Sequence, residues 1–348
     1  MNNISPLPIW TAVSDLHAKT VEEREWLVDQ WIPLGQPTLI YGDGGAGKSL
    51  IAKQLCACVA TNREWFGLEI KAGKSLYLTA EDDSAEVHRR LRDITREMGL
   101  NFSDLRNMEF VSLAGQDALL AQMRNNSGVL QQTELMNNIS AKIAHAKPKL
   151  VVIDTLADVF PADENQRSLA RQFIGFLRKP AVEHNCAIVV LAHPSLSGIT
   201  SGRGASGNTG WSNSVRSRLY LERTEDDHSN YRKLYLKKVN YSQSGKEIDL
   251  VWERGCFQHA VNRGVEVSRH ETIVEDLFLK LLEDFTIKGI GVNSRSGSSY
   301  APTKFSNHPD AQGVRKAAFK NAMDRLFSRG LIEDVKPEGA RASRIASV

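Results

Sequence analysis

The sequence predicts an α/β fold with a mixed, mainly parallel central sheet and a small C-terminal domain. Apolar runs of strand length alternate with helix-length runs between residues 37 and 192, the pattern of parallel strands joined by helical crossovers. Between residues 215 and 253, strand-like runs follow one another as hairpins, which predicts an antiparallel extension of the sheet. A change of composition near residues 261–267 indicates a boundary. We therefore expect a leader or arm at 1–34, a main domain at 35–262 and a C-terminal domain at 268–348.

The composition is that of a globular chain in water. Of the 348 residues, 41% are hydrophobic and 24% are charged, and a formal net charge of +3 does not by itself indicate a nucleic-acid-binding protein. No apolar run reaches the roughly 18 residues that a membrane span needs, and the first residues lack the basic and apolar regions of a signal peptide. The four cysteines have no zinc-ligand spacing. These features predict a cytoplasmic protein with reduced cysteines and no membrane association.

The leader ends in an acidic and aromatic stretch, residues 21–31, which includes Trp26 and Trp31. This stretch could form a short helix over the first strand, or an arm that docks on a neighbouring subunit. A packed N-terminal cap is the simpler of these two interpretations.

Residues 42–49 fit the pattern G-x-x-x-x-G-K-[ST] of a phosphate-binding loop, or P-loop. The residues before it (37–41) are typical of a buried strand, and those after it (50–55) of a helix. In this context backbone N–H groups and the helix N-terminus hold a triphosphate, Lys48 reaches its β- and γ-phosphates and Ser49 binds Mg²⁺. We therefore expect ATP and Mg²⁺ as ligands. The residues expected to bind the nucleotide are Gly42, Gly44, Gly45, Ala46, Gly47, Lys48, Ser49 and Leu50.

A cluster of acidic residues follows the next apolar strand, residues 75–79. At the carboxyl end of a strand beside the P-loop strand, a carboxylate can activate the attacking water. We predict that Glu81 is this base. Asp82 or Asp83 would instead cap the helix that begins near Ser84.

Two further buried strands also end in polar residues. Residues 150–154 are four apolar residues followed by Asp154, about 105 residues after the P-loop, the Walker B pattern in which the carboxylate holds the Mg²⁺ shell. Residues 187–192 form another apolar run that ends at His193. A polar residue at this place can sense the γ-phosphate or relay its state to the following loop, although a lone histidine is more often structural.

That following loop, residues 195–213, contains five glycines with serines between them, and Arg203 is its only charged residue. So many glycines disfavour helix and strand, which predicts a mobile loop at the nucleotide edge of the sheet. We expect this loop to contact a DNA backbone through Arg203; a plain flexible linker is the alternative. In the strands after it, Arg216 and Lys238 could reach a nucleotide held by an adjacent subunit.

The C-terminal domain has the element order of a winged helix. The pattern predicts a helix at 271–285, a Ser-, Gly- and Asn-rich loop, a second helix at 312–329 and a β-hairpin. From residue 287 onward there are eleven Lys or Arg residues against five Asp or Glu. This local basic excess suits a nucleic-acid backbone, and a protein-docking module is the alternative.

The order and spacing of these motifs resemble those of the RecA-like ATPases of the RepA type. That group includes hexameric replicative helicases of plasmids and ATPases of phages and prophages, and the resemblance covers about residues 35–260. It implies a RecA-like P-loop NTPase core, ring assembly and ATP hydrolysis at subunit interfaces. It also implies that Glu81 is the catalytic base, Asp154 the Walker B acid and His193 the strand-end histidine.

The same resemblance implies a role for residues of the antiparallel extension. It places the arginine finger, which acts on the site of the neighbouring subunit, at Arg216, with Arg218 as a close rival. Lys238 matches a basic residue near the same interface. The Gly- and Ser-rich loop matches the DNA-contacting loop.

Together these features predict an oligomeric, ATP-hydrolysing and DNA-dependent motor, a replicative helicase or translocase of a plasmid, phage or prophage. The expected partners are single-stranded DNA, further copies of the chain in a hexameric ring, and a replication initiator or primase. The alternative is an ATP-switched DNA-binding assembly in recombination or regulation that unwinds nothing. A protein-remodelling ATPase that does not act on DNA is a third class.

Overall fold

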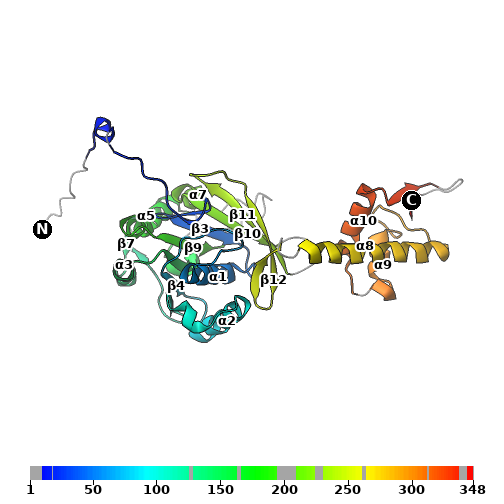
Figure 1. Cartoon of the computed structure of the whole chain (residues 1–348), viewed down its shortest axis with the longest axis horizontal. Helices are drawn as coiled ribbons and strands as arrows, with labels where there is room; N and C mark the ends of the chain where they lie inside the picture. Colours follow the sequence, from blue (N-terminus) through cyan, green and yellow to red (C-terminus); the bar gives the residue numbers. More distant parts are fainter. Residues whose placement is uncertain are drawn as a thin grey trace.

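The computed structural model describes residues 10–17, 19–124, 128–162, 166–193, 209–223, 230–260, 264–311, 313–336 and 343–347, with side chains left out at 209 and 264–272. A nine-stranded sheet forms the centre of the larger body of the chain, in the order β13-β12-β11-β10-β3-β9-β8-β4-β5 (Figure 1). Its strands are β3 (Pro37–Gly42), β4 (Ser75–Thr79), β5 (Met108–Ser112), β8 (Leu150–Asp154), β9 (Ala187–Ala192), β10 (Ser217–Arg223), β11 (Tyr231–Val239), β12 (Glu247–Glu253) and β13 (Cys256–His259).

The sheet is parallel from β10 through β3, β9, β8 and β4 to β5, and antiparallel from β10 to β13. This arrangement confirms the predicted RecA-like α/β fold with a mixed, mainly parallel sheet. Because the register pairs Thr79 with Asp154 and Tyr41 with Ala192, the carboxyl ends of β3, β4, β8 and β9 meet at one edge of the sheet. Residues that follow these four strands are thereby brought together.

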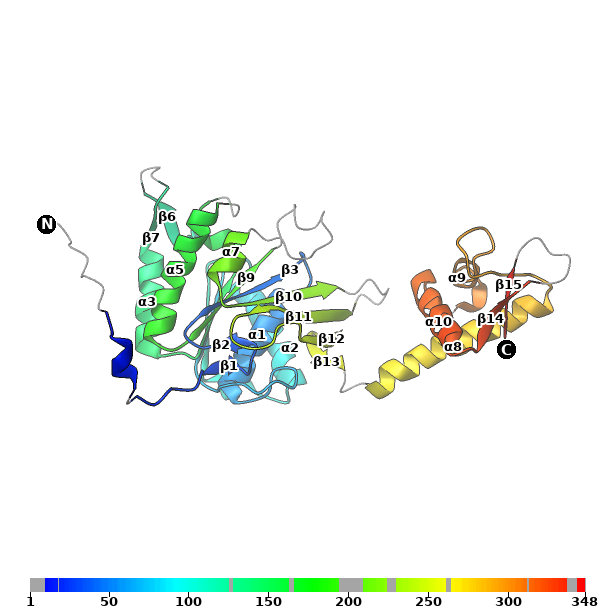
Figure 2. The same cartoon turned by 90° about the horizontal axis from the view of Figure 1, so that it is seen from above.

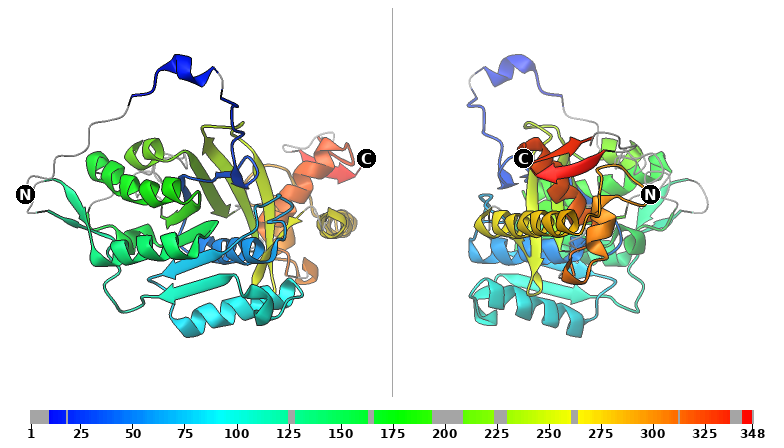
Figure 3. Two further views of the ribbon diagram at one scale, coloured as in Figure 1. Left: turned by 60° about the vertical axis from the view of Figure 1, so that its left-hand side comes forward. Right: turned by 90° about the vertical axis from the view of Figure 1, so that its right-hand side faces the viewer.

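Helices cover both faces of the sheet (Figure 3). Helices α1 (Lys48–Thr61) and α2 (Ser84–Glu97) lie on one face, and α3 (Glu134–Ala146) and α5 (Arg167–Glu183) on the other. Successive residues of β3 alternate between the two cores, since Ile40 belongs to the first and Leu39 and Tyr41 to the second. Burial on both faces explains why the strands are continuous apolar runs rather than alternating ones.

Shorter elements connect the main ones. These are the 3₁₀ turns η1 (Val13–Leu16) and η2 (Phe102–Leu105), the hairpin of β6 (Ala121–Met123) and β7 (Leu130–Gln132), and the helices α4 (Leu156–Val159) and α7 (Thr209–Ser214).

The N-terminal residues divide into two parts. The hairpin of β1 (Trp26–Val28) and β2 (Ile32–Pro33) packs into the first core, with Leu27 and Trp31 at most 2% exposed. The described residues from 10 to 25 are all exposed, and Trp10 is 90% exposed. The packed cap considered for the leader therefore describes residues 26–34, which form strands rather than a helix.

The C-terminal residues have a hydrophobic core of their own, assembled around α8 (Figure 2). The elements are α8 (Gly264–Ile287), α9 (Ala301–Ser306), the 3₁₀ turn η4 (Pro309–Ala311), α10 (Lys316–Ser328) and the hairpin of β14 (Ile332–Val335) with β15 (Arg344–Ser347). Buried Glu275 on α8 accepts hydrogen bonds from Arg325 of α10 and from Arg329, the C-cap residue of that helix. Two of the basic residues counted in this region are thus engaged within it.

The order of helices and hairpin agrees with the predicted pattern, with two differences. Helix α8 begins at Gly264, before the expected start at residue 271. Helix α9 lies where a loop is expected, because Pro302 fits the first turn of a helix and Ala301 and Phe305 are buried in the local core. Within the described residues, no helix has the length and apolar character needed to cross a membrane.

Candidate active site

The P-loop is the turn between β3 and α1. Gly45 and Gly47 have φ angles of 68° and 105°, in the left-handed region where glycine avoids strain. A side chain at Gly42 would place its Cβ 2.4 Å from the carbonyl oxygen of Leu221 on the adjacent strand β10. At Gly44, by contrast, a Cβ would meet no atom within 4 Å, so the loop is open to a ligand at this point.

Two arginines of the antiparallel extension donate hydrogen bonds to backbone carbonyl oxygens of the P-loop. Arg223 donates from Nη2 to the carbonyl oxygen of Gly45 (2.9 Å), and buried Arg232 donates from Nε to that of Ala46 (2.9 Å). Ala46 and Leu50 are themselves buried in the first core. The shape of the loop thus depends on residues far along the chain, and motif analysis did not find them.

Lys48 is brought to His193 by the neighbouring parallel strands β3 and β9. Its Nζ donates to the carbonyl oxygens of Gly42 (2.6 Å) and Asp43 (3.1 Å), and lies 3.3 Å from Nδ1 of His193. Burial lowers the pKa of Lys48. Burial, and then the charge of Lys48, lower the pKa of His193, which favours a neutral imidazole that accepts from Lys48.

Asp154 ends β8 and is 1% exposed. Its Oδ2 accepts a hydrogen bond from the hydroxyl of Tyr77, whereas its Oδ1 is buried and has no hydrogen-bond partner among the described residues. An unpaired buried carboxylate oxygen is costly unless a ligand satisfies it.

Two residues at this edge of the sheet carry oxygen atoms that suit Mg²⁺. A serine hydroxyl from Ser49 at the start of α1 and a carboxylate from Asp154 are oxygen ligands of the kind that Mg²⁺ shares with water and phosphate. In the described parts of the chain no group of three or more His, Cys, Asp or Glu side chains could hold a metal ion. A hydroxyl and a carboxylate as the two protein ligands fit a magnesium ion that arrives with a nucleotide and keeps most of its other ligands.

Glu81 lies in the loop after β4, at the same edge of the sheet. Its pKa is raised, first by loss of water around the carboxyl and then by the nearby carboxylates of Asp154, Asp158 and Asp82, while Lys48 acts to lower it. Glu81 thus shares its electrostatic environment with Asp154 and the P-loop lysine Lys48. Neither a hydrogen bond nor an ion pair engages its carboxylate within the described part of the chain.

The two acids that follow Glu81 have other partners. Asp82 forms an ion pair with Lys53 of α1 (2.8 Å), and Asp83 caps α2 by accepting from the backbone N–H of Glu86 (2.7 Å). Of the two acids predicted as possible caps of this helix, Asp83 is therefore the N-cap of α2. Of the three acids, Glu81 is the one whose carboxylate is left for a ligand.

Sequence analysis missed Lys53 and Tyr77 beside this edge. Lys53 is fully buried and donates to the Tyr77 hydroxyl (2.9 Å) as well as to Asp82. Tyr77 lies in an apolar strand, and Lys53 lies in a helix rich in apolar residues. The available signal was a lysine on the buried face of the P-loop helix, since lysine is almost never fully buried without partners.

Arg216 lies near the amino ends of β10 and β3, whereas the P-loop of the same chain follows the carboxyl end of β3. It precedes β10, which runs parallel to β3 with Ser217 beside Thr38 and Leu221 beside Gly42. Four residues of a strand span about 13 Å, so Arg216 is more than this distance from the end of β3. The fold therefore does not bring Arg216 to Lys48 of the same chain.

Lys238 and Arg218 lie near Arg216 on β11 and β10. Lys238 donates from Nζ to the carbonyl oxygens of Ser212 (2.5 Å) and Val215 (3.0 Å), and it is the cross-strand partner of Arg218. Burial, then Arg216 and Arg218, lower the pKa of Lys238. The three cations thus form a cluster of like charge, separate from the P-loop of the same chain.

The predicted DNA-contacting loop lies mostly outside the described residues, and Arg203 lies outside them as well. Its end is described and forms α7. There Trp211 is buried beside Phe160, with ring centroids 4.9 Å apart. The end of the loop is therefore fixed to the helical layer formed by α5.

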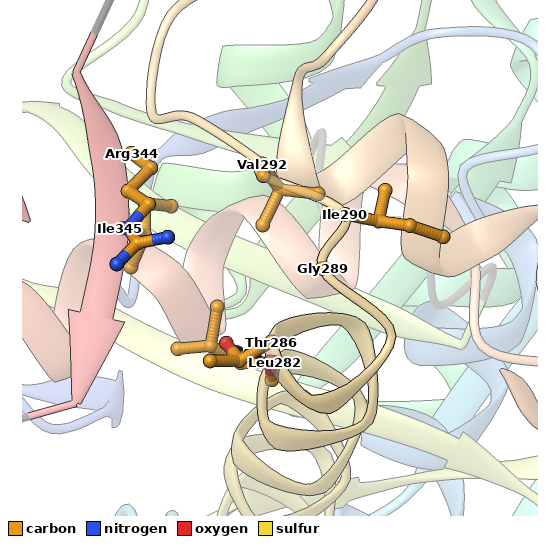
Figure 4. A pocket seen from close by; sticks show the side chains of 8 residues that line it. Leu282, Thr286, Gly289, Ile290, Val292, Arg344 and Ile345 are labelled. Atoms are coloured by element: carbon orange, nitrogen blue, oxygen red, sulfur yellow. Dashed lines mark hydrogen bonds between the residues drawn. The ribbon is translucent and has the colours of Figure 1, made fainter. Parts of the chain in front are cut away.

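A small pocket lies in the C-terminal part, between the end of α8 and β15 (Figure 4). The residues that line it are Leu282, Thr286, Gly289, Ile290, Gly291, Val292, Arg344 and Ile345. Its lining combines apolar side chains with the polar Thr286 and Arg344, and none of the residues predicted for catalysis takes part. The candidate active site is instead the carboxyl edge of the sheet, where the chemically competent groups meet.

The first part of the chain is similar to known proteins. A family model described as AAA domain matches residues 5–198, which include the P-loop, Glu81, Asp154 and His193. Among solved structures, the chain is similar to the RadB recombinase, with 16% sequence identity and a TM-score of 0.48 over 66% of this chain and 92% of that chain.

Proposed function

The chain belongs to the AAA domain family, and from this premise we propose that it is an ATP-hydrolysing, oligomeric and DNA-dependent motor. The specific role that we propose is a replicative DNA helicase or translocase of a plasmid, phage or prophage. Residues 35–262 would form the motor and residues 268–348 a winged-helix-like domain.

The observation that carries the proposal is the meeting of Lys48, Oδ1 of Asp154 and the carboxylate of Glu81 at one edge of the sheet, where neither this oxygen nor the Glu81 carboxylate has a hydrogen-bond partner within the described ranges. The open P-loop at Gly44 would receive the phosphates of ATP. Lys48 would exchange the carbonyl oxygens that it now contacts for phosphate oxygens. Such a set of groups positions and neutralises a transferring phosphoryl group.

Glu81 would orient the attacking water, since its carboxylate has no partner among the residues that the structure describes and its raised pKa makes it a better proton acceptor than an ordinary glutamate. Mg²⁺ would be held by Ser49 and Asp154 and would supply positive charge to the β- and γ-phosphates. His193 would report on the γ-phosphate, because its imidazole contacts Lys48 and stands directly before the Gly- and Ser-rich loop.

Arg216 would complete the site of a neighbouring subunit. Its position away from its own P-loop supports action in trans, and a finger from a neighbour stabilises the transition-state charge. Arg218 is the rival for this role, and Lys238 would lie at the same interface. A site shared in this way would link hydrolysis to assembly, for which we propose a hexameric ring.

Single-stranded DNA is the proposed track, contacted by Arg203 in the Gly- and Ser-rich loop, and the C-terminal basic residues would add backbone contacts. A replication initiator or primase would act beside the motor. The alternative is an ATP-switched DNA-binding assembly that does not unwind, since the same active site would serve either function.

The experiment that tests the proposal is the ATPase rate with and without single-stranded DNA, together with the particle mass in ATP. Strong stimulation and a closed ring-sized species are expected, and Lys48→Ala is the control that removes hydrolysis. A monomer or dimer without stimulation would overturn the motor and leave a switch or remodelling ATPase. If stimulation and a ring-sized species are found, an unwinding assay separates a helicase from a static DNA-binding assembly.

A further inference from the structure

Lys53 is a fully buried lysine in the first turns of the P-loop helix α1. A buried ammonium group is strongly unfavourable unless oxygen atoms compensate its charge. Three oxygen atoms do so here. Nζ lies 2.8 Å from Oδ2 of Asp82, 2.9 Å from the hydroxyl of Tyr77 and 4.0 Å from Oδ2 of Asp154.

The direction of each hydrogen bond follows from the groups involved. An ammonium group only donates, so the Tyr77 hydroxyl accepts from Lys53, and its single proton is then donated to Oδ2 of Asp154. This chain from Lys53 through Tyr77 fixes one oxygen of Asp154. The other oxygen, Oδ1, is the buried atom without a hydrogen-bond partner among the described residues.

The same ammonium group also holds the loop that carries Glu81. Asp82, the residue after Glu81, accepts from Lys53, and its backbone N–H donates to Oγ1 of Thr79 (3.1 Å). Ser112 donates to the backbone carbonyl of Asp82 (2.8 Å). The two peptide groups that flank Asp82, one of which joins it to Glu81, are therefore each held by a hydrogen bond.

We propose that Lys53 is a positioning residue with two arms, which orients the carboxylate of Asp154 through Tyr77 and the loop of Glu81 through Asp82. Lys53 contacts neither nucleotide nor metal in this role. It sets where the metal-binding oxygen and the base stand relative to one another. The inference rests on the proposed ATPase function.

The two arms can be cut separately. Tyr77→Phe removes one hydroxyl and leaves the pair of Lys53 with Asp82. We expect about tenfold more Mg²⁺ to be required for half-maximal ATPase activity, because partners that orient a metal ligand typically contribute 10- to 100-fold to metal affinity. The turnover number at saturating Mg²⁺ should be largely retained. Asp82→Asn should instead lower the turnover number and leave the Mg²⁺ requirement unchanged.

A second readout does not depend on hydrolysis. A fluorescent, non-hydrolysable ATP analogue is titrated in EDTA and at increasing Mg²⁺. In EDTA, Tyr77→Phe should bind it like wild type, since the P-loop is intact, and the gain in affinity on adding Mg²⁺ should require about tenfold more of the ion. Tyr235→Phe on β11 is the matched control, because it removes a phenolic hydroxyl from the same sheet away from these carboxylates.

Unchanged Mg²⁺ dependence of Tyr77→Phe in both assays would overturn the inference, and so would a Mg²⁺ shift equally large in Asp82→Asn. Lys53→Met should combine both defects, and if it does not fold the two single-arm variants decide. A wild-type protein that binds nucleotide with Mg²⁺ and hydrolyses none would overturn the proposed function instead. The binding titration would still test Lys53 in that case.

Discussion

Nζ of Lys48 lies 3.3 Å from Nδ1 of His193, across the two neighbouring strands β3 and β9. The contact joins the lysine that is predicted to bind phosphate to the last described residue before the Gly- and Ser-rich loop. A nucleotide that draws Lys48 toward its phosphates would change the environment of His193. This geometry links occupation of the P-loop to the start of the predicted DNA-contacting loop.

Substitution of His193 tests this link. His193→Ala should leave nucleotide affinity within a few-fold of wild type, because Lys48 keeps its carbonyl partners, and should reduce the stimulation of ATPase activity by single-stranded DNA. His145→Ala, at an exposed position in the last turn of α3, is the control. Full DNA stimulation in His193→Ala would make the histidine a packing residue only.

Glu81→Gln should bind ATP and hydrolyse it slowly. The amide cannot accept the proton of the attacking water, and loss of a general base typically lowers the rate by 10² to 10⁴-fold. Single-turnover hydrolysis and nucleotide binding measured on one preparation separate the two effects. Wild-type turnover in this variant would move the base to Asp82 or Asp83.

Mixtures of two inactive variants test the shared site. Arg216→Ala and Lys48→Ala should each lose activity, and mixing them should restore part of it if Arg216 acts in trans, because some interfaces then carry both intact halves. Arg218→Ala in place of Arg216→Ala distinguishes the two candidate fingers. The absence of recovery at any mixing ratio would contradict a site built from two subunits.

Removal of residues 268–348 tests the C-terminal domain. The described C-terminal elements have their own hydrophobic core, so basal ATPase activity should persist after truncation. Affinity for DNA should fall, and its dependence on salt should weaken, because fewer backbone contacts release fewer counterions. Unchanged DNA affinity in a binding titration across salt concentrations would identify a protein-docking module.

Glu25 offers a test of how the N-terminal residues are held. Hydrogen bonds from Lys71 and then Asn185 lower the pKa of its carboxyl. A carboxyl with a lowered pKa in the folded state stabilises that state above its ordinary pKa, and the contribution disappears as the pH falls through the folded value. Because the pair is exposed, Glu25→Gln should reduce the free energy of unfolding at pH 7 by at most about 1 kcal/mol.

Denaturation of wild type and Glu25→Gln at neutral and at acidic pH measures this difference. The gap between the two proteins should close at acidic pH, below the lowered pKa of Glu25. A gap of equal size at both values would mean that the side chain acts by packing rather than by charge.

Much of the fold and part of the candidate site could be predicted from contiguous sequence. The order of strands and helices followed from apolar runs that are buried on both faces, such as residues 150–153 of β8. The P-loop, Glu81 and Asp154 could be named because each lies at or just after the carboxyl end of a strand, and these ends lie at one edge of a parallel sheet. In such a fold, local sequence fixes both the element and the edge at which its last residue stands.

Only the tertiary structure decided which distant side chains support that edge. Tyr77 and Asp154 are 77 residues apart, and Arg232 lies 186 residues from the P-loop carbonyl that it holds. In the sequence, Tyr77 is one more large residue in an apolar strand, since a single buried polar atom does not change the strand pattern. The sequence thus determined the groups that would touch a nucleotide, and the packing of the sheet and α1 determined the groups that hold them in place.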